Sequence, residues 1–319
     1  MASAAPHTFG VRCPSAPAAA LTLAPLGVPL AVELVGADDL DLLAAACRQW
    51  RGVATCSSPR LRLRIEAGGE RADRTAVRIS VEDGVMHLRG GAAGTADPVS
   101  GEAACHVPMR YLASPDLLRA EVLEPLVLYL LGRNGRAPVH ASCFVADGLA
   151  VLLSGPSGSG KSCLALAAHA AGFPVLSEDI VYVQVDPQLR VWGWPGPVHL
   201  LPANAPHDGA FPQRVRNGKT KLAVPLGAAG SRAMSASRAV FCLLERGGAV
   251  ALERLAPEAA AHRLDRLEPG FDVMASEVRA AHAALTRNGA WRLMLSADPD
   301  EAIRFIAANL ATLRAATVP

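Results

Sequence analysis

The segment from residue 155 to residue 162 constrains this chain more than any other. It reads Gly155, Pro156, Ser157, Gly158, Ser159, Gly160, Lys161, Ser162 and fits the phosphate-binding pattern G-x-x-x-x-G-K-[ST] at every position. The pattern has this meaning only between a strand and a helix. The apolar run 149–153 is typical of a buried strand, and 163–171 is rich in helix formers, with Gly172 placed to cap them. This context favours a phosphate-binding loop over a chance Gly/Ser-rich turn.

The chemistry of such a loop requires these residue types. Glycines let the backbone turn tightly, so that successive N–H groups and the helix N-terminus point at one anion. We therefore expect the backbone from Gly155 to Cys163 to bind the phosphates of a nucleoside triphosphate, with ATP as the default. Lys161 would reach the β- and γ-phosphates, and the Ser162 hydroxyl would join the ligands of a Mg²⁺ ion.

The composition sets limits on the class of protein. The 319 residues suffice for one large domain or two ordinary ones, and with 51% hydrophobic and 19% charged residues a core is expected. A net charge of +2 argues against a nucleic-acid-binding protein. The seven cysteines lack C-x-x-C spacing, which is typical of reduced cytosolic thiols and gives no zinc signal.

An apolar run from 18 to 35 raises the question of a signal peptide or a membrane span. Pro25, Gly27 and Pro29 interrupt it and Glu33 lies within it, whereas a spanning helix needs ~20 consecutive apolar residues. We expect one or two buried strands here, in a cytoplasmic protein without a membrane partner.

Residues 1–130 carry no pattern that indicates chemistry, and we expect them to form a small α+β domain. The strictly alternating run 60–65 predicts a strand with one wet, basic face, for which a solvated surface is favoured over a nucleic-acid site. The other expected elements are a frayed segment at 1–17, a helix at 39–50 capped by Asp38, a hairpin at 76–89 turning at 82–84, a Gly/Ala loop at 90–97, and a helix from Ser114 to Leu131 kinked at Pro125.

The remaining residues, 131–319, are expected to form the domain that contains the phosphate-binding loop. The run 139–145 predicts a strand, and Asp147-Gly148 predicts a tight turn into the strand 149–153. The loop strand would then have an antiparallel partner directly before it. Depending on register, His140 would lie at the loop end of the sheet or at the opposite end. A single histidine in a strand is more often packed than catalytic.

Two carboxylates follow the loop helix after a short spacing. Glu178 and Asp179 lie between the apolar residues 175–176 and an alternating strand predicted at 180–185. Adjacent residues of a strand point to opposite faces, so one acid could face Mg²⁺ while the other has a different role. A solvated Ser-Glu-Asp turn is the alternative, but the apolar neighbours favour a functional pair.

Lysine is rare in this chain, and its positions form a second signal. The lysines are Lys161, Lys219 and Lys221, and the last two fall in a segment, 203–223, that also holds Arg214 and Arg216 and that we expect to be a long loop. Such a loop often contacts substrate, although a solvated basic loop remains the alternative. Farther on we expect a hairpin at 238–255 across Gly247-Gly248, helices from Pro257 and at 273–286, a strand at 291–296, and one helix at 299–313 capped by Asp298.

Residues 138–185 resemble the HPr serine kinase/phosphorylase family, whose fold is shared with phosphoenolpyruvate carboxykinases. The resemblance lies in His140, the run 148–154, the loop 155–162, Ala165-Leu166, Gly172 and Ser177-Glu178-Asp179. It implies an α/β domain with a mixed sheet in which an antiparallel strand precedes the loop strand. It also implies that His140 lies by the γ-phosphate, that Ser162 helps to hold Mg²⁺, and that Asp179 acts on an acceptor hydroxyl.

The chain also departs from that family. The first acid is usually Asp, whereas Glu178 stands here, and the later Gly- and Arg-rich signature of the family is not recognisable. Residues 1–130 do not resemble the family's N-terminal domain. The chain looks more similar to the HPr-kinase-like proteins of peptide-tailoring gene sets, such as lasso-peptide kinases.

The sequence therefore predicts an ATP- and Mg²⁺-dependent kinase acting on a hydroxyl, most simply a Ser of a peptide or protein. Lys161, Glu178, Asp179 and His140 are the predicted catalytic residues, Ser162 and Glu178 the predicted metal ligands, and Arg214, Lys219 and Lys221 the predicted substrate contacts. A nucleotide-binding regulatory module without an acceptor and a small-molecule kinase are the alternatives, and self-association is left open.

Overall fold

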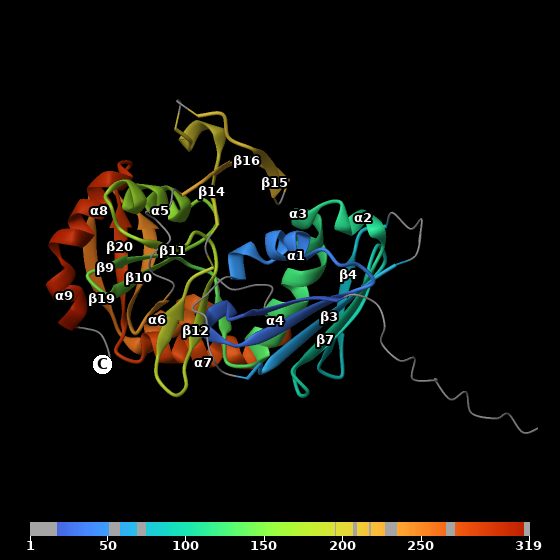
Figure 1. Ribbon diagram of the computed structural model, residues 1–319. Helices are drawn as coiled ribbons and strands as arrows, with labels where there is room; N and C mark the ends of the chain where they lie inside the picture. Colours follow the sequence, from blue (N-terminus) through green and yellow to red (C-terminus); the bar gives the residue numbers. More distant parts are fainter. Residues whose placement is uncertain are drawn as a thin grey trace, which may run out of the picture.

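The protein is described here from a computed structural model, which describes residues 18–50, 58–68, 75–194, 196–206, 209–216, 218–226, 235–265 and 272–315. The prediction for residues 1–17 lies outside these ranges. Within them the chain is a mixed α/β molecule whose strands form four sheets. Figure 1 shows a large sheet with its helices beside a second body, in which helices cover both faces of another sheet.

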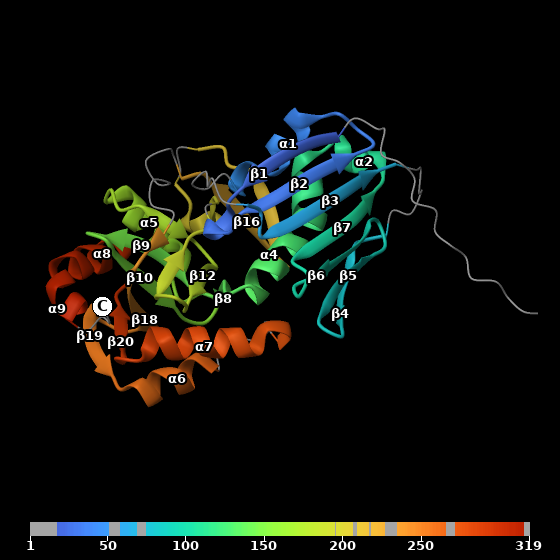
Figure 2. The same ribbon diagram turned by 60° about the horizontal axis from the view of Figure 1, so that its bottom comes forward.

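The first sheet has the strand order β1-β2-β3-β7-β6-β5-β4. One face packs on helices α1 (Leu40–Ala46) and α4 (Glu124–Arg133), and the other is open, as Figure 2 also shows. In β3 the side chains alternate between buried and exposed, as predicted. The strands are β1 (Ala18–Leu23), β2 (Leu30–Val35), β3 (Leu61–Ala67), β4 (Arg78–Glu82), β5 (Val85–Arg89), β6 (Ala93–Asp97) and β7 (Glu102–Val107).

Two predictions for this region were wrong. Residues 93–97 form the paired strand β6 instead of a loop, because its small residues fit between β5 and β7 although they show no apolar alternation. The first helix is capped by Asp39, whose Oδ1 accepts a hydrogen bond of 2.8 Å from the Leu42 N–H, and it ends at Ala46 before a 3₁₀ turn at Arg48–Trp50.

The helix predicted from Ser114 to Leu131 is divided into segments. Ser114 caps α3 (Pro115–Leu118), as expected, and the chain continues through a π-helical turn, η3 (Arg119–Leu123), into α4. Pro125 cannot donate a backbone hydrogen bond, and the wider turn just before it absorbs the irregularity that we expected as a kink. A short helix, α2 (Met109–Leu112), precedes α3. The predicted domain division after residue 130 falls inside α4 and stays a prediction.

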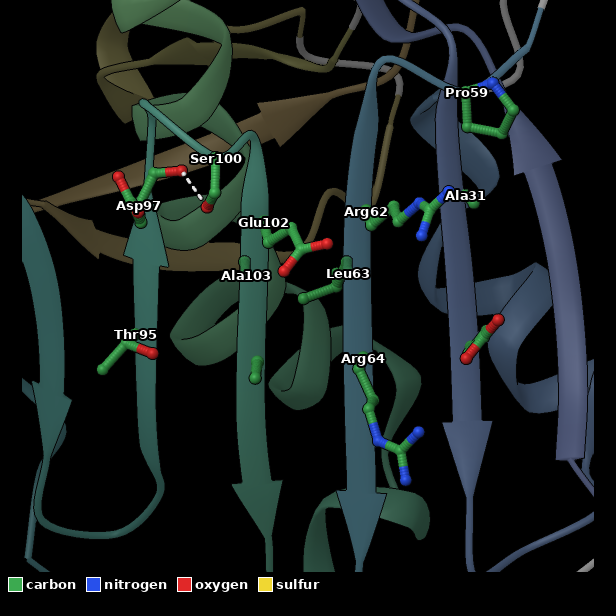
Figure 3. A pocket seen from close by; sticks show the side chains of 12 residues that line it. Ala31, Pro59, Arg62, Leu63, Arg64, Thr95, Asp97, Ser100, Glu102 and Ala103 are labelled. Atoms are coloured by element: carbon green, nitrogen blue, oxygen red, sulfur yellow. Dashed lines mark hydrogen bonds between the residues drawn. The ribbon is translucent and has the colours of Figure 1, made fainter. Parts of the chain in front are cut away.

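The open face of the first sheet is hollowed into a shallow cavity of about 710 Å³. Figure 3 shows Arg62 and Arg64 of β3 beside Glu102 of β7, with Ser100 donating to the backbone oxygen of Asp97. Arg64 also pairs with Glu66 at 3.0 Å. Opposite charges therefore stand next to one another on a solvated face, as the alternation of β3 predicts.

The second body is built on a six-stranded sheet of order β11-β9-β10-β18-β20-β19. Helices α5 and α8 cover one face, and α6 and α7 cover the other. The elements are β9 (Ser142–Ala146), β10 (Leu149–Ser154), α5 (Lys161–Ala170), β11 (Val175–Ser177), β18 (Arg238–Arg246), β19 (Ala251–Leu255), α6 (Pro257–Asp265), α7 (Ala275–Thr286), β20 (Ala290–Leu295), α8 (Pro299–Ala308) and α9 (Leu310–Ala315).

The strand that leads into the phosphate-binding loop is central and buried, as predicted. Every residue of β10 is buried, with β18 parallel on one side and β9 antiparallel on the other. The Asp147-Gly148 turn joins β9 to β10, with φ of 47° and 77°, which suits a two-residue hairpin. Arg314 of α9 lies over this turn, donating to the Asp147 backbone oxygen at 2.6 Å.

Three predictions for the second body were wrong. The run 139–145 is interrupted after Val139, so that β8 (Ala137–Val139) pairs with β12 in another sheet while β9 pairs with β10. Strands β18 and β19 do not form a hairpin, because β20 lies between them. The last helix is broken at Asn309, which caps α8. Strand order and helix breaks depend on tertiary packing, which a local pattern does not contain.

Two small sheets complete the fold. One has the order β17-β13-β12-β8, and its strand β12 is buried throughout instead of showing the predicted alternation. The other has the order β14-β16-β15, so that much of the segment predicted as a loop at 203–223 is a paired hairpin. Their remaining strands are β12 (Val181–Gln184), β13 (Arg190–Trp192), β14 (Val198–Leu200), β15 (Gln213–Arg216), β16 (Lys219–Val224) and β17 (Ser235–Ala236).

The two bodies share packed side chains. Tyr182 of β12 belongs to the apolar core of the first sheet, and Trp192 and Trp194 pack against that core. Trp194 lies between Trp50 and Tyr182, with ring centroids 6.3 and 5.9 Å away. Among the described residues no helix is long and apolar enough to cross a membrane.

Candidate functional site

The loop between β10 and α5 has the backbone that phosphate binding needs. Gly158 and Gly160 have φ of 87° and 109°, which residues with a side chain rarely adopt, and Gly160 is the N-cap residue of α5. A Cβ at Gly160 would also approach Arg246 Nη2 within 3.3 Å. These glycines therefore allow the loop to wrap around the N-terminus of α5, where free N–H groups and the helix dipole favour an anion.

Lys161 lies folded back over this loop. Its Nζ donates to the Gly155 backbone oxygen at 2.6 Å and to that of Pro156 at 3.4 Å, and the side chain is buried. Two serines also form hydrogen bonds next to the loop. Ser142 Oγ donates to the Lys161 backbone oxygen at 3.3 Å, and Ser154 Oγ donates to the His140 backbone oxygen at 3.1 Å. The ammonium is thus held at the loop that it would serve.

Ser159 supplies a second feature that fits an anion. Its Oγ is buried and has no hydrogen-bond partner among the described residues. A buried hydroxyl without a partner is costly, and a phosphate oxygen at the loop could accept its proton. The loop thus contains a polar atom whose bonding a phosphate would complete.

Glu178 is brought to the start of α5. Its Oε1 accepts a hydrogen bond of 2.7 Å from Ser162 Oγ, and its Oε2 lies 3.2 Å from His199 Nδ1. The carboxylate is buried, with 8% of its residue surface exposed. A hydroxyl and a carboxylate beside a phosphate-binding loop are oxygen donors that suit Mg²⁺, which is usually held by one or two protein groups together with substrate phosphates. The residues present therefore fit the ion.

Asp179 points to a different partner. Its Oδ1 lies 3.0 Å from His140 Nε2, and both side chains are about one-third exposed. The register that pairs Leu153 with Ser142 places His140 at the loop end of β10, which decides between the two positions left open by the sequence. The two acids lie in a bend after β11, so their divergence comes from this bend and not from strand alternation.

His199 is a residue of this site that the sequence did not suggest. It lies in β14, in the local sequence Val198-His199-Leu200, whose neighbours are buried. A single histidine in an apolar strand is typical of packing. Only the approach of β14 to the bend at Glu178 reveals the contact.

The predicted substrate residues lie on the β15–β16 hairpin. Arg214 is directly opposite Lys221, and such pairs share one face of an antiparallel sheet. Lys219, two residues along β16, is on that face as well and is exposed, whereas Lys221 is half-buried. Arg214 lines the same cavity as Asp179, so the hairpin brings one predicted residue to the site and the two lysines alongside it.

Two cavities flank the loop and the acids. The larger, of about 800 Å³, is lined by Glu178, Asp179 and His199, and on its opposite wall by residues of α3, η3 and α4. The smaller, of about 240 Å³, is next to Gly160 and is lined by residues including Cys163, Arg246, Ser296 and Asp298. Burial raises the pKa of the Cys163 thiol, although Arg246 acts in the opposite direction.

Comparisons with known proteins add little to this geometry. No family model and no curated protein matches the sequence. Among solved structures the chain is similar to the HPr(Ser) kinase/phosphatase from Coxiella burnetii, with a TM-score of 0.30 and 14% identity over 56% of this chain and 99% of that one. A similarity this weak carries no functional conclusion, so the function is inferred from the site itself.

Proposed function

We propose that the protein is a phosphotransferase that moves the γ-phosphoryl group of ATP to a hydroxyl, namely a Ser of a peptide or protein. One observation carries the proposal. A complete phosphate-binding loop lies beside two carboxylates with different partners, Glu178 on Ser162 and Asp179 on His140. A protein that only senses nucleotide has no need of the second carboxylate in a cavity large enough for an acceptor.

The donor would be held mainly by the loop. Backbone N–H groups from Gly155 to Cys163 and the Ser159 hydroxyl bind the phosphates, and Lys161 leaves the Gly155 oxygen to contact the β- and γ-phosphates. Bound Mg²⁺, held by Ser162 and Glu178, would neutralise charge on the phosphate oxygens. The nucleoside would extend toward the smaller cavity beside Gly160 and Arg246.

The acceptor step follows from Asp179. Its carboxylate accepts the proton of the acceptor hydroxyl while the hydroxyl oxygen forms a bond to the γ-phosphorus. The bond from that phosphorus to the bridging oxygen breaks, and ADP leaves with the electron pair. His140, 3.0 Å from Asp179, would orient the carboxylate beside the γ-phosphate. The products are ADP and a phosphoserine.

Two substitutions separate these roles. Lys161→Ala should weaken ATP binding and turnover together, because the ammonium contacts the phosphates in both ground and transition states. Asp179→Asn should leave ATP affinity within a few-fold and lower turnover by ~10²–10⁴. The measurements are binding of a fluorescent ATP analogue and transfer from labelled ATP to a panel of Ser-containing peptides.

Other outcomes identify the alternatives. Near-full activity of Asp179→Asn would transfer the role of base to Glu178. Nucleotide binding with slow hydrolysis and no labelled acceptor would indicate a regulatory module. Labelling of small hydroxy compounds without labelling of any peptide would indicate a metabolite kinase.

A further inference from the structure

The wall of the larger cavity that faces Asp179 comes from the first body. It is formed by the 3₁₀ turn at Arg48–Trp50 and by the segment from Ser114 to Leu128, across from the bend at Ser177–Ile180. An acceptor hydroxyl that reaches Asp179 from this cavity would lie between the two walls, because Asp179 lines it. The first body, for which the sequence suggested no task, would then contribute one wall of the acceptor site.

The cavity continues into a second one. The second cavity, of about 480 Å³, lies toward the β15–β16 hairpin and adds an apolar lining. The two have in common Arg48, Gln49, Ser177, Gly196, Pro197 and Arg214. Each volume is within the range of pockets that enclose small organic groups, so neither admits a folded protein surface. Together they form one groove with two differently lined parts.

The charge of the groove changes along its length. At the Asp179 end, the lining carboxylates Asp116, Glu121, Glu124, Glu178 and Asp179 outnumber the lining arginines Arg48, Arg119 and Arg214. Arg48 and Arg119 are paired with acids of their own wall, since Asp116 lies 3.2 Å from Arg48 and 2.9 Å from Arg119, and Glu124 lies 3.5 Å from Arg119. At the other end the lining includes Leu176, Pro212, Ala223 and Leu226.

We propose that the acceptor enters this groove as an extended peptide segment, held between the two bodies, with basic residues on one side of its Ser and apolar residues on the other. The proposal rests on the proposed function. The carboxylates at the Asp179 end attract the basic residues, and the apolar end buries the apolar ones. Two joined cavities with chemically different linings suit an extended chain that passes through both better than a compact metabolite that fills one.

Ala120 allows the groove to be blocked without touching the phosphate-binding loop. It is exposed, lies in η3 and lines the larger cavity. Ala113, the exposed C-cap residue of α2, is not among the residues that line the groove and is the matched control. The probe is a peptide library with a fixed central Ser and randomised flanks, incubated with γ-labelled ATP. Affinity for a fluorescent ATP analogue is measured in parallel.

The wild-type protein should label peptides with Lys or Arg on one side of the Ser and apolar residues on the other. Ala120→Trp should lower labelling at least about tenfold, because the indole occupies volume that the peptide needs, with nucleotide affinity unchanged. Ala113→Trp should behave as wild type. Ala120→Arg is a second variant, and it should selectively reduce labelling of the basic peptides.

Three results would overturn the proposal. They are unchanged labelling by both Ala120 variants, labelling without flank preference, and labelling of free serine or other small hydroxy compounds in place of peptides. In all three the wild type still binds nucleotide and transfers phosphate. A wild type that binds no nucleotide would instead refute the proposed function. Normal nucleotide affinity in the variants shows that they are folded.

Discussion

Glu178 and Asp179 are neighbours in sequence with separate partners in space. The bend after β11 directs one carboxylate to Ser162 and the other to His140. Glu178 is buried while Asp179 is about one-third exposed. Burial beside the loop suits a group that holds an ion, and exposure to the groove suits a group that must meet an incoming hydroxyl.

His199 should act through Glu178. Removing the imidazole in His199→Ala frees Glu178 Oε2 from its 3.2 Å contact, so the carboxylate can rotate away from Ser162. Such supporting residues typically contribute ~10–100-fold to metal affinity. We expect the Mg²⁺ concentration for half-maximal binding of the nucleotide analogue to rise by about that factor.

His199→Gln is the control for this prediction, since its amide can still donate to the carboxylate. It should recover most of the Mg²⁺ affinity. If His199→Ala has the Mg²⁺ dependence of wild type, the histidine only packs.

Cys163 should be a slow nucleophile despite its place at the loop. Burial raises the pKa of its thiol, so the thiolate fraction near pH 8 is below that of an ordinary cysteine. The rate of Cys163 alkylation by iodoacetamide should therefore be lower than that of glutathione at pH 8. It should continue to rise with pH at values where the glutathione rate has levelled off. Peptide mapping by mass spectrometry measures this site separately. Faster alkylation than glutathione at pH 7 would contradict the prediction.

Among the elements, those encoded locally could be predicted from the sequence. β10, the glycine loop and α5 follow from an apolar run, a matched motif and helix formers, and the Asp147-Gly148 hairpin follows from its turn residues. Elements fixed by packing could not be predicted. The insertion of β20 between β18 and β19 has no local signal, nor has the interruption at His140 that sends β8 to another sheet.

The same distinction holds within the site. The loop residues and both acids were identifiable because their spacing in the sequence is short. The contact of His199 with Glu178 and the closure of the groove by η3 join segments that are distant in sequence. The roles of these residues stay predictions until the substitutions are made.

The β15–β16 hairpin gives a prediction about the two lysines. Lys221 is half-buried opposite Arg214, which lines the groove, and Lys219 is exposed farther along the strand. Lys221→Ala should lower acceptor phosphorylation more than Lys219→Ala does, and the double variant should lower it most. ATP affinity should stay unchanged, because neither side chain belongs to the phosphate-binding loop.

Thr220→Ala is the control, since Thr220 lies between the two lysines and faces the opposite side of the strand. Phosphorylation and nucleotide binding are measured side by side. Unchanged phosphorylation in the double variant would mean that these lysines are ordinary surface residues.

The molecule as a whole depends on contacts between its two bodies. Arg136 Nε donates to the Leu26 backbone oxygen at 2.9 Å, and Arg133 pairs with Glu277 at 2.5 Å. With the tryptophans that pack on the first core, these contacts fix the position of α4 between the bodies. The width of the groove therefore depends on packing between the bodies, including that of Trp194, which lines the larger cavity.

Gly27 tests this packing. Its φ is 73°, and a Cβ there would collide with the ring of Trp192. Gly84 has a similar φ of 79° with nothing within 4 Å. Gly84→Ala should lower the free energy of unfolding by ~1 kcal/mol, through the backbone conformation alone. Gly27→Ala should cost a further ~1–3 kcal/mol, because the tryptophan must move.

Urea unfolding followed by tryptophan fluorescence measures the free energy of unfolding of each variant and of the wild type. Equal losses of stability in the two variants would show that the Trp192 contact contributes nothing. If the position of α4 depends on this contact, Gly27→Ala should also weaken peptide phosphorylation while Gly84→Ala does not.

The turn at Asp147-Gly148 has a practical consequence. The turn precedes β10 and the glycine loop follows β10. The length of the strand, about 20 Å, therefore separates the turn from the loop. Nothing lies within 4 Å of a Cβ added at Gly148, and the Arg314 contact to Asp147 holds the turn in place. A fluorophore or surface tether attached here would report on a rigid strand while leaving the opposite end of the sheet unobstructed. Single molecules immobilised through this turn would present their glycine loop to the solution.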